Sequence, residues 1–347
     1  MENKETVLVT GGSGFIGSHC IIQLAAAGYN VKATVRDLSR TNKLNQILLT
    51  GLEKHEGKSD LSVDWQVANL SSDEGWEEAV KGCDYVLHVA SPIGMELPKN
   101  EDEMVKPAVE GTLRVLKAAS KAGVKRVVIT SSVAAIMYGT DKQGVFNEED
   151  WTNPESKTTN VYAKSKTLAE QAAWDFIKKD TTGMELSTVL PAMVFGPILE
   201  EDFGVSVGAI LDMMNGKYPI VPNWDMGIVD VRDVASLELL AMTKPEAAGK
   251  RFVCSAENMF MKDQNEYLSE IFPESASKIP KRVAPNWLIK FLALFLPALK
   301  MIAEGLGKKR SMDSSQARNL LGWNPRSARE AVKSAAESAK EFGLIED

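Results

Sequence analysis

Cysteine is scarce in this sequence, and a long basic run is absent. The three cysteines, Cys20, Cys83 and Cys254, are odd in number, lie far apart and have apolar neighbours. This pattern favours buried thiols over a disulfide framework or a metal site. Lys and Arg number 40 against 47 for Asp and Glu, and the net charge of −7 disfavours a nucleic-acid partner. We therefore expect a cytoplasmic protein that needs no metal.

The sequence also lacks an apolar run long enough for a signal peptide or a membrane span. Residues 1–5 lead directly into a strand-like segment, which predicts that no signal peptide is present. The most apolar stretch, Trp287–Leu306, is interrupted by Lys290, Pro297, Lys300 and Glu304, and its uninterrupted runs are too short to span a bilayer. We expect an amphipathic helix that covers the substrate site and no membrane partner; the alternative is a membrane-surface anchor.

What the sequence does contain is enough apolar material for a large core. Its 347 residues, 44% hydrophobic and 25% charged, predict one large or two closely joined domains. Over the first 130 residues, β-branched runs alternate with segments of helical periodicity, which predicts a parallel sheet with helices on both faces. The expected strands are Thr6–Thr10, Val31–Val35, Val63–Val67, Tyr85–Val89 and Arg126–Thr130. The predicted fold class is α/β with a doubly wound sheet.

The second half of the chain is less regular. A helix is expected over about Asn160–Lys179 and a strand over Glu185–Leu190, after which prolines interrupt short mixed segments. We expect residues 1–190, together with about 226–254, to form the sheet domain. Residues 191–225 and 255–347 are expected to form a smaller mixed lobe that binds the substrate.

A strand that turns through glycines directly into a helix is the strongest local pattern. Thr6–Thr10 is followed by Gly11, Gly14 and Gly17 in a Gly-x-x-Gly-x-x-Gly arrangement. Glycine lets the backbone turn tightly and approach a pyrophosphate closely, while the N–H groups and dipole of the helix attract the anion. Because further strand–helix units follow, the pattern predicts a dinucleotide site rather than a merely tight structural turn.

The end of the second expected strand indicates which dinucleotide binds. Arg36 and Asp37 stand there, and Lys43 follows. An arginine at this position pairs with the 2′-phosphate of NADPH, whereas a lone acidic residue accepts the ribose hydroxyls of NADH. We interpret Arg36 and Lys43 as a phosphate clamp, which favours NADPH. The alternative is that both are solvated cations and that Asp37 holds the ribose.

A serine pair and a tyrosine–lysine pair supply candidate catalytic groups. Ser131 and Ser132 follow the fifth expected strand, and Tyr162 and Lys166 lie four residues apart on the next helix. That spacing places the phenol and the ammonium on one face, near the carboxyl ends of the strands. Because tyrosine ordinarily titrates near about pH 10, a neighbouring ammonium is needed to stabilise its phenolate near neutrality. The alternative is a half-buried tyrosine beside a surface lysine.

These motifs together resemble the extended short-chain dehydrogenase/reductase family. The family pattern is matched by Thr10–Gly17, Thr130–Ser132 and Tyr162–Lys166. Segments similar to the branch of dihydroflavonol reductases, cinnamoyl-CoA reductases and microbial aldehyde or ketone reductases are His88–Pro92, Leu190–Pro197, Val229–Asp233 and Leu321–Arg326. The resemblance runs along nearly the whole chain, and it implies a Rossmann-type fold and a nicotinamide-dependent oxidoreductase.

The resemblance also implies a role for each matching residue. Tyr162 would donate a proton to the substrate carbonyl, Ser132 would orient that carbonyl, and Lys166 would hold the nicotinamide ribose and lower the pKa of the tyrosine. Ser131 is the less favoured of the two serines. Further cofactor contacts would come from Phe15, Ile16, Asn69, Leu70, Ala90, Ser91, Pro191 and Val194.

The expected substrate pocket departs from that of the flavonoid-specific members of the branch. Met137 stands where dihydroflavonol reductases carry a polar residue that reads the flavonoid, so we expect an apolar and adaptable pocket. The candidate wall residues are Met95, Val133, Met137, Phe195 and Val205.

We therefore expect an enzyme that uses NADPH to reduce a small aldehyde or ketone, as a monomer or homodimer. One alternative is an NAD(P)-dependent sugar-nucleotide epimerase or dehydratase, which shares the catalytic group but must bind a second pyrophosphate. The pair of Arg36 and Lys43 and the apolar second lobe speak against it. Another alternative is a non-catalytic NADP-sensing module, against which the intact Ser132, Tyr162 and Lys166 weigh.

Overall fold

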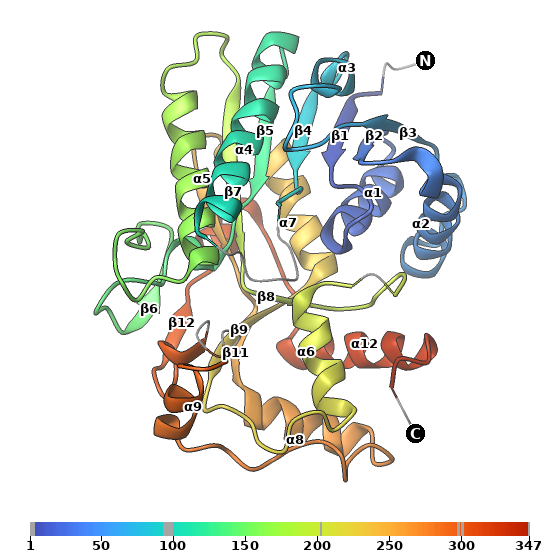
Figure 1. The fold of residues 1–347 in the computed structure, drawn as a ribbon. Coiled ribbons are helices and arrows are strands. Elements are labelled where there is room, and N and C mark those ends of the chain that lie inside the picture. The colour runs from blue at the N-terminus through green and yellow to red at the C-terminus, as the bar shows by residue number, and fades with distance from the viewer. Residues whose placement is uncertain (1–3, 93–99, 202, 297–298, 300–301, 346–347) are drawn as a thin grey trace.

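The larger part of the molecule is a seven-stranded sheet (Figure 1). The structure is a computed structural model that describes residues 4–92, 100–201, 203–296, 299 and 302–345. All neighbouring strands of this sheet are parallel, in the order β10-β7-β5-β4-β1-β2-β3. The strands are β1 (Thr6–Thr10), β2 (Asn30–Val35), β3 (Val63–Val67), β4 (Tyr85–His88), β5 (Arg126–Thr130), β7 (Glu185–Pro191) and β10 (Arg251–Cys254). The predicted doubly wound parallel sheet is confirmed.

Helices cover both faces of this sheet. Successive side chains of β1 point to opposite faces, so Val7 and Val9 pack against one set of helices and Leu8 against the other. The first set is α1 (Phe15–Ala27), α2 (Thr41–Glu56), α7 (Val231–Thr243) and α11 (Ser315–Leu321). The second set is α3 (Trp76–Val80), α4 (Asp102–Ala122) and α5 (Val161–Ile177). Burial on both faces explains why these strands are almost continuously apolar in sequence.

A smaller lobe is built around a three-stranded mixed sheet. β8 (Met193–Phe195) runs parallel to β9 (Asp225–Asp230), which is antiparallel to β11 (Glu257–Phe260). The helices α6 (Val205–Met214), α8 (Met261–Ile271) and α12 (Ala328–Glu341) contribute to one apolar core with these strands. The remaining elements are β6 (Gly144–Phe146) with its parallel partner β12 (Arg310–Met312), α9 (Asn286–Leu292), and the short helices η1 (Leu38–Arg40), η2 (Val133–Ala135) and η3 (Pro245–Ala247). The predicted smaller mixed lobe is confirmed.

The chain crosses between the two sheets within residues 225–254. β9 belongs to the small sheet, where it pairs with both β8 and β11. The next helix, α7, packs on α1 of the large sheet, and β10 then adds an edge strand beside β7. The helix that starts at the end of β9 is thus one of the connections between the two sheets, beside the direct passages from β7 to β8 and from β10 to β11.

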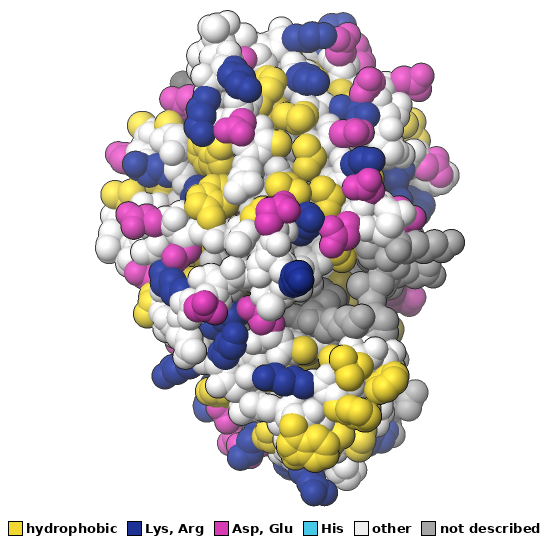
Figure 2. All heavy atoms as spheres, turned by 60° about the vertical axis from the view of Figure 1, so that its left-hand side comes forward, with side chains coloured by type: hydrophobic (Ala, Val, Ile, Leu, Met, Phe, Trp, Pro, Cys, Tyr) yellow, Lys and Arg dark blue, Asp and Glu magenta, His cyan; other side chains and the backbone are white. Residues whose placement is uncertain are grey.

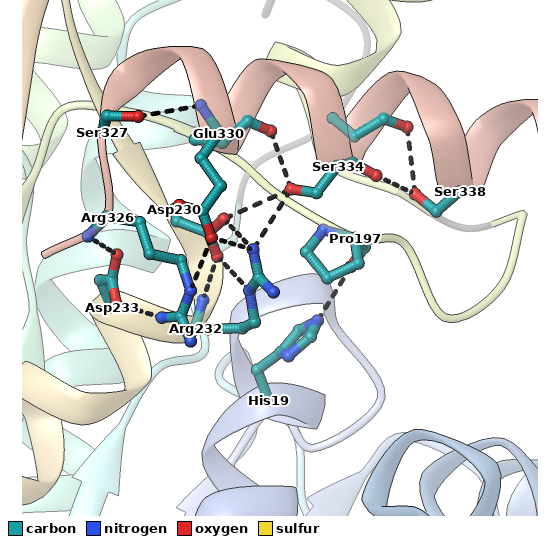
Figure 3. Close-up of polar contacts among 12 residues, drawn as sticks. His19, Pro197, Asp230, Arg232, Asp233, Arg326, Ser327, Glu330, Ser334 and Ser338 are labelled. Atoms are coloured by element: carbon teal, nitrogen blue, oxygen red, sulfur yellow. Dashed lines mark hydrogen bonds and ion pairs between the residues drawn. The ribbon is translucent and has the colours of Figure 1, made fainter. Parts of the chain in front are cut away.

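A cluster of charged residues lies where α7 begins and joins the two parts of the molecule (Figure 3). We call Asp230, Arg232, Asp233 and Arg326 the polar seam. The guanidinium of Arg232 donates to the two carboxylate oxygens of Asp230 at 2.8 and 2.6 Å. Asp233 accepts a hydrogen bond from the backbone N–H of Arg326 at 2.7 Å and forms an ion pair with its guanidinium. Since Arg326 lies two residues before the start of α12, the seam fixes this helix against α7.

A neutral histidine makes a second connection at the same place (Figure 3). His19 on α1 donates from Nε2 to the carbonyl oxygen of Pro197, which follows β8, at 3.0 Å. Burial lowers the pKa of His19 to about 4, and the positive charges of His55 and Arg232 act in the same direction. The imidazole is therefore uncharged at neutral pH and serves as a hydrogen-bond donor between the two parts.

Candidate active site

The turn between β1 and α1 has no room for side chains at Gly11 and Gly17. Gly11 has a φ of +68°, and a Cβ at Gly17 would lie 2.2 Å from the carbonyl oxygen of Gly11. Gly14 immediately precedes α1, and its amide donates to the Gly11 carbonyl at 3.0 Å. The first amides of a helix, here those of Phe15 and Ile16, have no acceptor within it. The turn therefore offers backbone donors at a helix N-terminus, which fits the pyrophosphate of a dinucleotide.

Three basic residues lie close to the end of β2. The side chain of Arg36 is exposed, and Asp37 caps η1 with its carboxylate. Lys43 Nζ lies 3.6 Å from a carboxylate oxygen of Glu200, and Arg40 Nη2 lies 3.0 Å from the same oxygen. Sequence reasoning missed Arg40, although its position three residues before Lys43 at the start of a helix was an available signal. The structure thus brings Arg40 and Lys43 together on one anion.

Two of the predicted cofactor contacts, Asn69 and Leu70, follow β3. Asn69 is exposed, and its side-chain oxygen accepts a hydrogen bond from the backbone N–H of Ser71 at 3.1 Å. Leu70 packs on α4, where a Cβ at Gly111 would lie 2.8 Å from the Cβ of Leu70. Asn69 therefore shapes the turn after β3, and Leu70 anchors that turn to the helix layer.

The end of β4 meets the glycine turn at Ala90. The backbone N–H of Ala90 donates to Thr10 Oγ1 at 3.0 Å, and His88 Nδ1 lies 2.8 Å from the same oxygen. Burial lowers the pKa of His88 to about 3, and the positive charge of Lys166 acts in the same direction. A small cavity at this place is lined by His88, Ala90, Ser91, Pro92, Ala108, Thr112, Ile129, Thr130, Ser131, Lys166, Ala169 and Glu170. The structure thus gathers the predicted residues Ala90, Ser91 and Lys166 around one space.

The two adjacent serines after β5 have different partners. Ser132 accepts a hydrogen bond from the backbone N–H of Ala134 at 3.1 Å, and its hydroxyl lies near the phenol of Tyr162. Ser131 instead donates to a carboxylate oxygen of Glu170 at 2.6 Å. Burial raises the pKa of Tyr162, and the nearby Ser132 opposes this rise. Ser132 is therefore the serine that the structure brings to the tyrosine.

Lys166 lies one helical turn beyond Tyr162 and is almost fully buried. Its Nζ donates to the backbone carbonyl of Thr130 at 3.3 Å. Burial lowers the pKa of Lys166 to about 8, while the negative charges of Glu170 and Glu238 oppose this change. The ammonium therefore sits at the carboxyl end of β5, beside the serines, as a buried cation whose charge depends on nearby carboxylates.

Residues 7–255 match the family described as the NAD dependent epimerase/dehydratase family. The chain belongs to this family. Over 287 residues it is 35% identical to cinnamoyl-CoA reductase CAD2 of Medicago truncatula, across 81% of this chain and 84% of that protein. Dihydroflavonol 4-reductase of Zea mays is 34% identical over 283 residues, 79% of this chain and 76% of the relative. The crystal structure of yeast methylglyoxal/isovaleraldehyde reductase Gre2 with NADPH is similar at a TM-score of 0.78 and 28% identity, across 98% and 100% of the two chains.

Membership of this family, the extended short-chain dehydrogenase/reductases, confirms the resemblance that the motifs indicate. It also confirms the prediction of a nicotinamide-dependent oxidoreductase, since the family is described as NAD dependent and the two relatives above are reductases. The Gre2 structure is an NADPH complex, in agreement with the predicted cofactor.

Sequence reasoning missed Glu238, an ionisable residue near the candidate active site. It lies on α7 and is fully buried, and Thr130 Oγ1 donates to its Oε1 at 2.6 Å. Its Oε2 has no hydrogen-bond partner among the described residues. Burial raises the pKa of Glu238 to about 8, against the opposing effects of Thr130 and Lys166. The available signal was an acidic residue between Leu237 and Leu239 in an otherwise apolar part of the helix.

The predicted wall residues separate into groups. Val133 and Met137 lie together in one apolar cluster just after the serine pair. Phe195 is 1% exposed in the core of the smaller lobe, and Val205 is 72% exposed at the start of α6. Met95 lies outside the described residues. The structure therefore brings Val133 and Met137 together but does not bring Phe195 or Val205 to them.

The last two predicted cofactor residues lie where β7 leads into β8. Pro191 ends β7, and Val194 lies in β8, where it packs against the apolar core of the large sheet. Pro191 therefore lies at the carboxyl end of β7 and Val194 just beyond it, on the path from the large sheet into the smaller lobe.

Proposed function

We propose that the protein is an NADPH-dependent carbonyl reductase that converts a small aldehyde or ketone to an alcohol. The observation that carries this proposal is the placement of Ser132 near the phenol of Tyr162, one helical turn from the buried Lys166. Two hydroxyl groups that lie near each other can donate to one oxygen atom, and that arrangement stabilises the charge that develops on a carbonyl oxygen during reduction. The relatives above, which are reductases, support this direction of chemistry.

In this proposal Tyr162 supplies the proton. Because burial raises the pKa of its phenol, Tyr162 is protonated near neutral pH and can donate to the carbonyl oxygen. Ser132 orients that oxygen, and Lys166 binds the nicotinamide ribose and stabilises the phenolate that the transfer leaves behind. When bound, NADPH supplies the hydride that reaches the carbonyl carbon. Val133 and Met137 form an apolar wall beside Ser132.

The preference for NADPH is assigned to Arg36, Arg40 and Lys43. Arg40 and Lys43 both approach one carboxylate oxygen of Glu200, so their side chains can reach a single anion. A 2′-phosphate there would make charge-assisted hydrogen bonds with them. Replacing Arg40 and Lys43 with alanine is expected to raise the KM for NADPH by about tenfold or more and to leave that for NADH nearly unchanged. An equal effect on both cofactors would contradict the assignment.

The reaction is tested by following NADPH absorbance with aldehydes, α-keto esters, diketones and aryl ketones. Tyr162→Phe should lower kcat by about 100-fold or more, because the proton donor is lost, while NADPH binding measured by fluorescence is retained. Tyr218→Phe, at an exposed tyrosine of the smaller lobe, is the matched control and should keep full activity. Unchanged turnover in Tyr162→Phe would contradict the mechanism. A nicotinamide that stays bound through gel filtration, with no net oxidation of NADPH, would instead indicate a sugar-nucleotide epimerase or dehydratase.

A further inference from the structure

A concentrated group of apolar side chains is exposed on α9 and the turn that follows it. Trp287 is 70% exposed, and Leu294 and Phe295 are each 69% exposed. The group, which we call the 287–296 patch, consists of Trp287, Phe291, Leu294, Phe295 and Leu296. The other exposed large apolar side chains of the described residues are spread along the chain from Leu38 to Phe342. Figure 2 shows apolar side chains gathered at the end of the molecule where α9 lies.

This segment is apolar on both of its sides. Ile289 and Ala293, one helical turn apart, are each 5% exposed and face the body of the lobe, where Ile289 packs with Ala284 and Leu306. Trp287 and Phe291 have the same spacing on the opposite side, and the rings of Phe291 and Phe295 contact each other with centroids 5.5 Å apart. The inner face therefore anchors the segment in the fold, so the outer face is available for a partner outside the chain.

The sequence segment that contains the patch carries charge of one sign. Residues 275–303 contain five Lys or Arg and no Asp or Glu, within a chain of net charge −7. Lys281, Arg282 and Lys290 are exposed in this stretch. Figure 2 shows Lys and Arg side chains beside the apolar group. An exposed aromatic and aliphatic surface with a cationic border is complementary to an interface that is apolar below and anionic above.

Contrary to the expectation of no membrane partner, we propose that the 287–296 patch, with Lys281, Arg282 and Lys290, docks the protein onto the surface of an anionic lipid bilayer. The segment would lie in the interface, with its aromatic side chains at the level of the acyl boundary and its cations among the headgroups. Within the described part of the chain, no helix is long and apolar enough to cross a membrane. A second copy of the chain is a poorer fit, because a two-fold contact through this patch would bring the same cations face to face.

The proposal is tested by sedimenting the full chain with vesicles. Binding is expected to phosphatidylcholine vesicles that contain phosphatidylserine and to be much weaker with phosphatidylcholine alone. It should fall as salt is raised from about 0.1 to 1 M, because the screening length shortens from about 10 to 3 Å. Equal binding to both vesicle types, or no binding to either, would overturn the proposal.

Two surface variants separate the apolar and the charged contributions. The triple variant Trp287→Ser, Phe291→Ser, Phe295→Ser should lose vesicle binding. The triple variant Lys281→Gln, Arg282→Gln, Lys290→Gln should lose the preference for the anionic vesicle, by about fivefold in partition for each cation removed. Neither set includes a residue of the proposed active site, so thermal unfolding and NADPH binding should stay as in the parent chain and report that the fold is intact.

The matched controls lie elsewhere on the surface. Leu320→Ser removes an exposed leucine outside the patch, and Lys121→Gln with Lys178→Gln removes exposed lysines on other helices. Vesicle binding should be unchanged in both. If light scattering instead shows a dimer that the apolar triple variant dissociates, the patch is an interface between copies and the lipid assignment fails.

Discussion

Thr130 contacts two buried ionisable side chains through different atoms. Its hydroxyl donates to Glu238 at 2.6 Å, and its carbonyl accepts from Lys166 at 3.3 Å. Glu238 approaches from α7 on one face of the sheet, and Lys166 from α5 on the other. Other titratable groups around them include Glu170 on α5, His88 on β4, Cys20 on α1 and Cys254 on β10. Burial is the largest cause of the pKa shifts of Lys166, Glu238 and His88.

Glu238 should make the stability of the protein depend on pH. Burial raises its pKa from 4.5 to about 8, so the folded chain holds a proton that the unfolded chain releases in this window. The contribution of Glu238 to stability therefore falls as pH rises from about 5 to 8, whereas the low pKa values of His19 and His88 act in the opposite direction below about pH 6.5. Glu238→Gln removes the Glu238 contribution and retains an acceptor for Thr130. In urea unfolding at several pH values, the variant should therefore gain stability relative to the parent chain as pH rises, by an amount on the order of a few kcal/mol.

The control for this measurement is Glu78→Gln, at an exposed glutamate of α3. It should follow the parent curve at every pH. Parallel curves for the parent chain and Glu238→Gln would show that Glu238 does not carry the buried proton.

The two serines should separate activity from stability. Ser132→Ala removes the group that meets Tyr162 and should lower kcat by about 100-fold, as loss of one donor to a developing oxyanion does. Ser131→Ala removes a hydrogen bond to the buried carboxylate of Glu170 and should cost about 1–3 kcal/mol of unfolding free energy with little change in kcat. Steady-state kinetics and urea unfolding of both variants check this. The reverse assignment of effects would mean that Ser131 faces the substrate.

At this scale the sequence could predict residue types but not all of their contacts. Adjacent residues after a strand point in different directions, so one of Ser131 and Ser132 had to face away from Tyr162, and only the fold decides which. Glu238 is far from Lys166 in sequence and reaches Thr130 because α7, which follows the crossover from the small sheet, packs on the face of the large sheet. Local patterns carry no information about such crossings.

Among the elements, the turn from β1 into α1 places the strictest requirement on residue type, because it needs glycine. A Cβ at Gly17 would lie 2.2 Å from the Gly11 carbonyl oxygen, so Gly17→Ala must displace the turn that offers its amides to the pyrophosphate. We expect NADPH affinity to fall by about 100-fold, because oriented backbone donors are lost. Gly208→Ala in α6, where a Cβ would meet Phe203 at an ordinary 3.6 Å, is the control. Fluorescence titration with NADPH measures both, and equal affinities would contradict the role of the turn.

The elements of the large sheet could be predicted closely, whereas those of the small lobe could not. The expected strands of the large sheet differ from the observed ones by at most one residue at either end, because β-branched residues buried on two faces leave a continuous apolar run. β8, β9 and β11 have only three to six residues each and come from distant parts of the chain. Their pairing depends on which segments the large sheet and its helices bring together. Strands this short contain too few residues to show a clear alternation of apolar and polar side chains.

For the molecule as a whole, the polar seam should determine how firmly the two parts are joined. Arg326→Ala leaves the buried carboxylate of Asp233 without its cation. We expect a loss of about 2 kcal/mol in unfolding free energy, since the guanidinium is partly exposed and a fully buried pair would cost more. Lys333→Ala, which removes an exposed ion pair on α12, should change stability by less than about 0.5 kcal/mol. Chemical unfolding of both variants measures these losses. Similar losses would mean that the polar seam stabilises the protein no more than an exposed ion pair does.

The seventh strand of the large sheet has a consequence for how the protein is made. β10 is synthesised some sixty residues after its neighbour β7, and α7, which covers α1, is made just before it. A chain still emerging from the ribosome therefore already contains the glycine turn, the serines and the tyrosine. At that stage one edge of β7 is still unpaired, and α7 does not yet cover α1. Exposed strand edges invite association with other chains. Chaperone capture during translation is accordingly expected to cease only once residue 254 has left the exit tunnel.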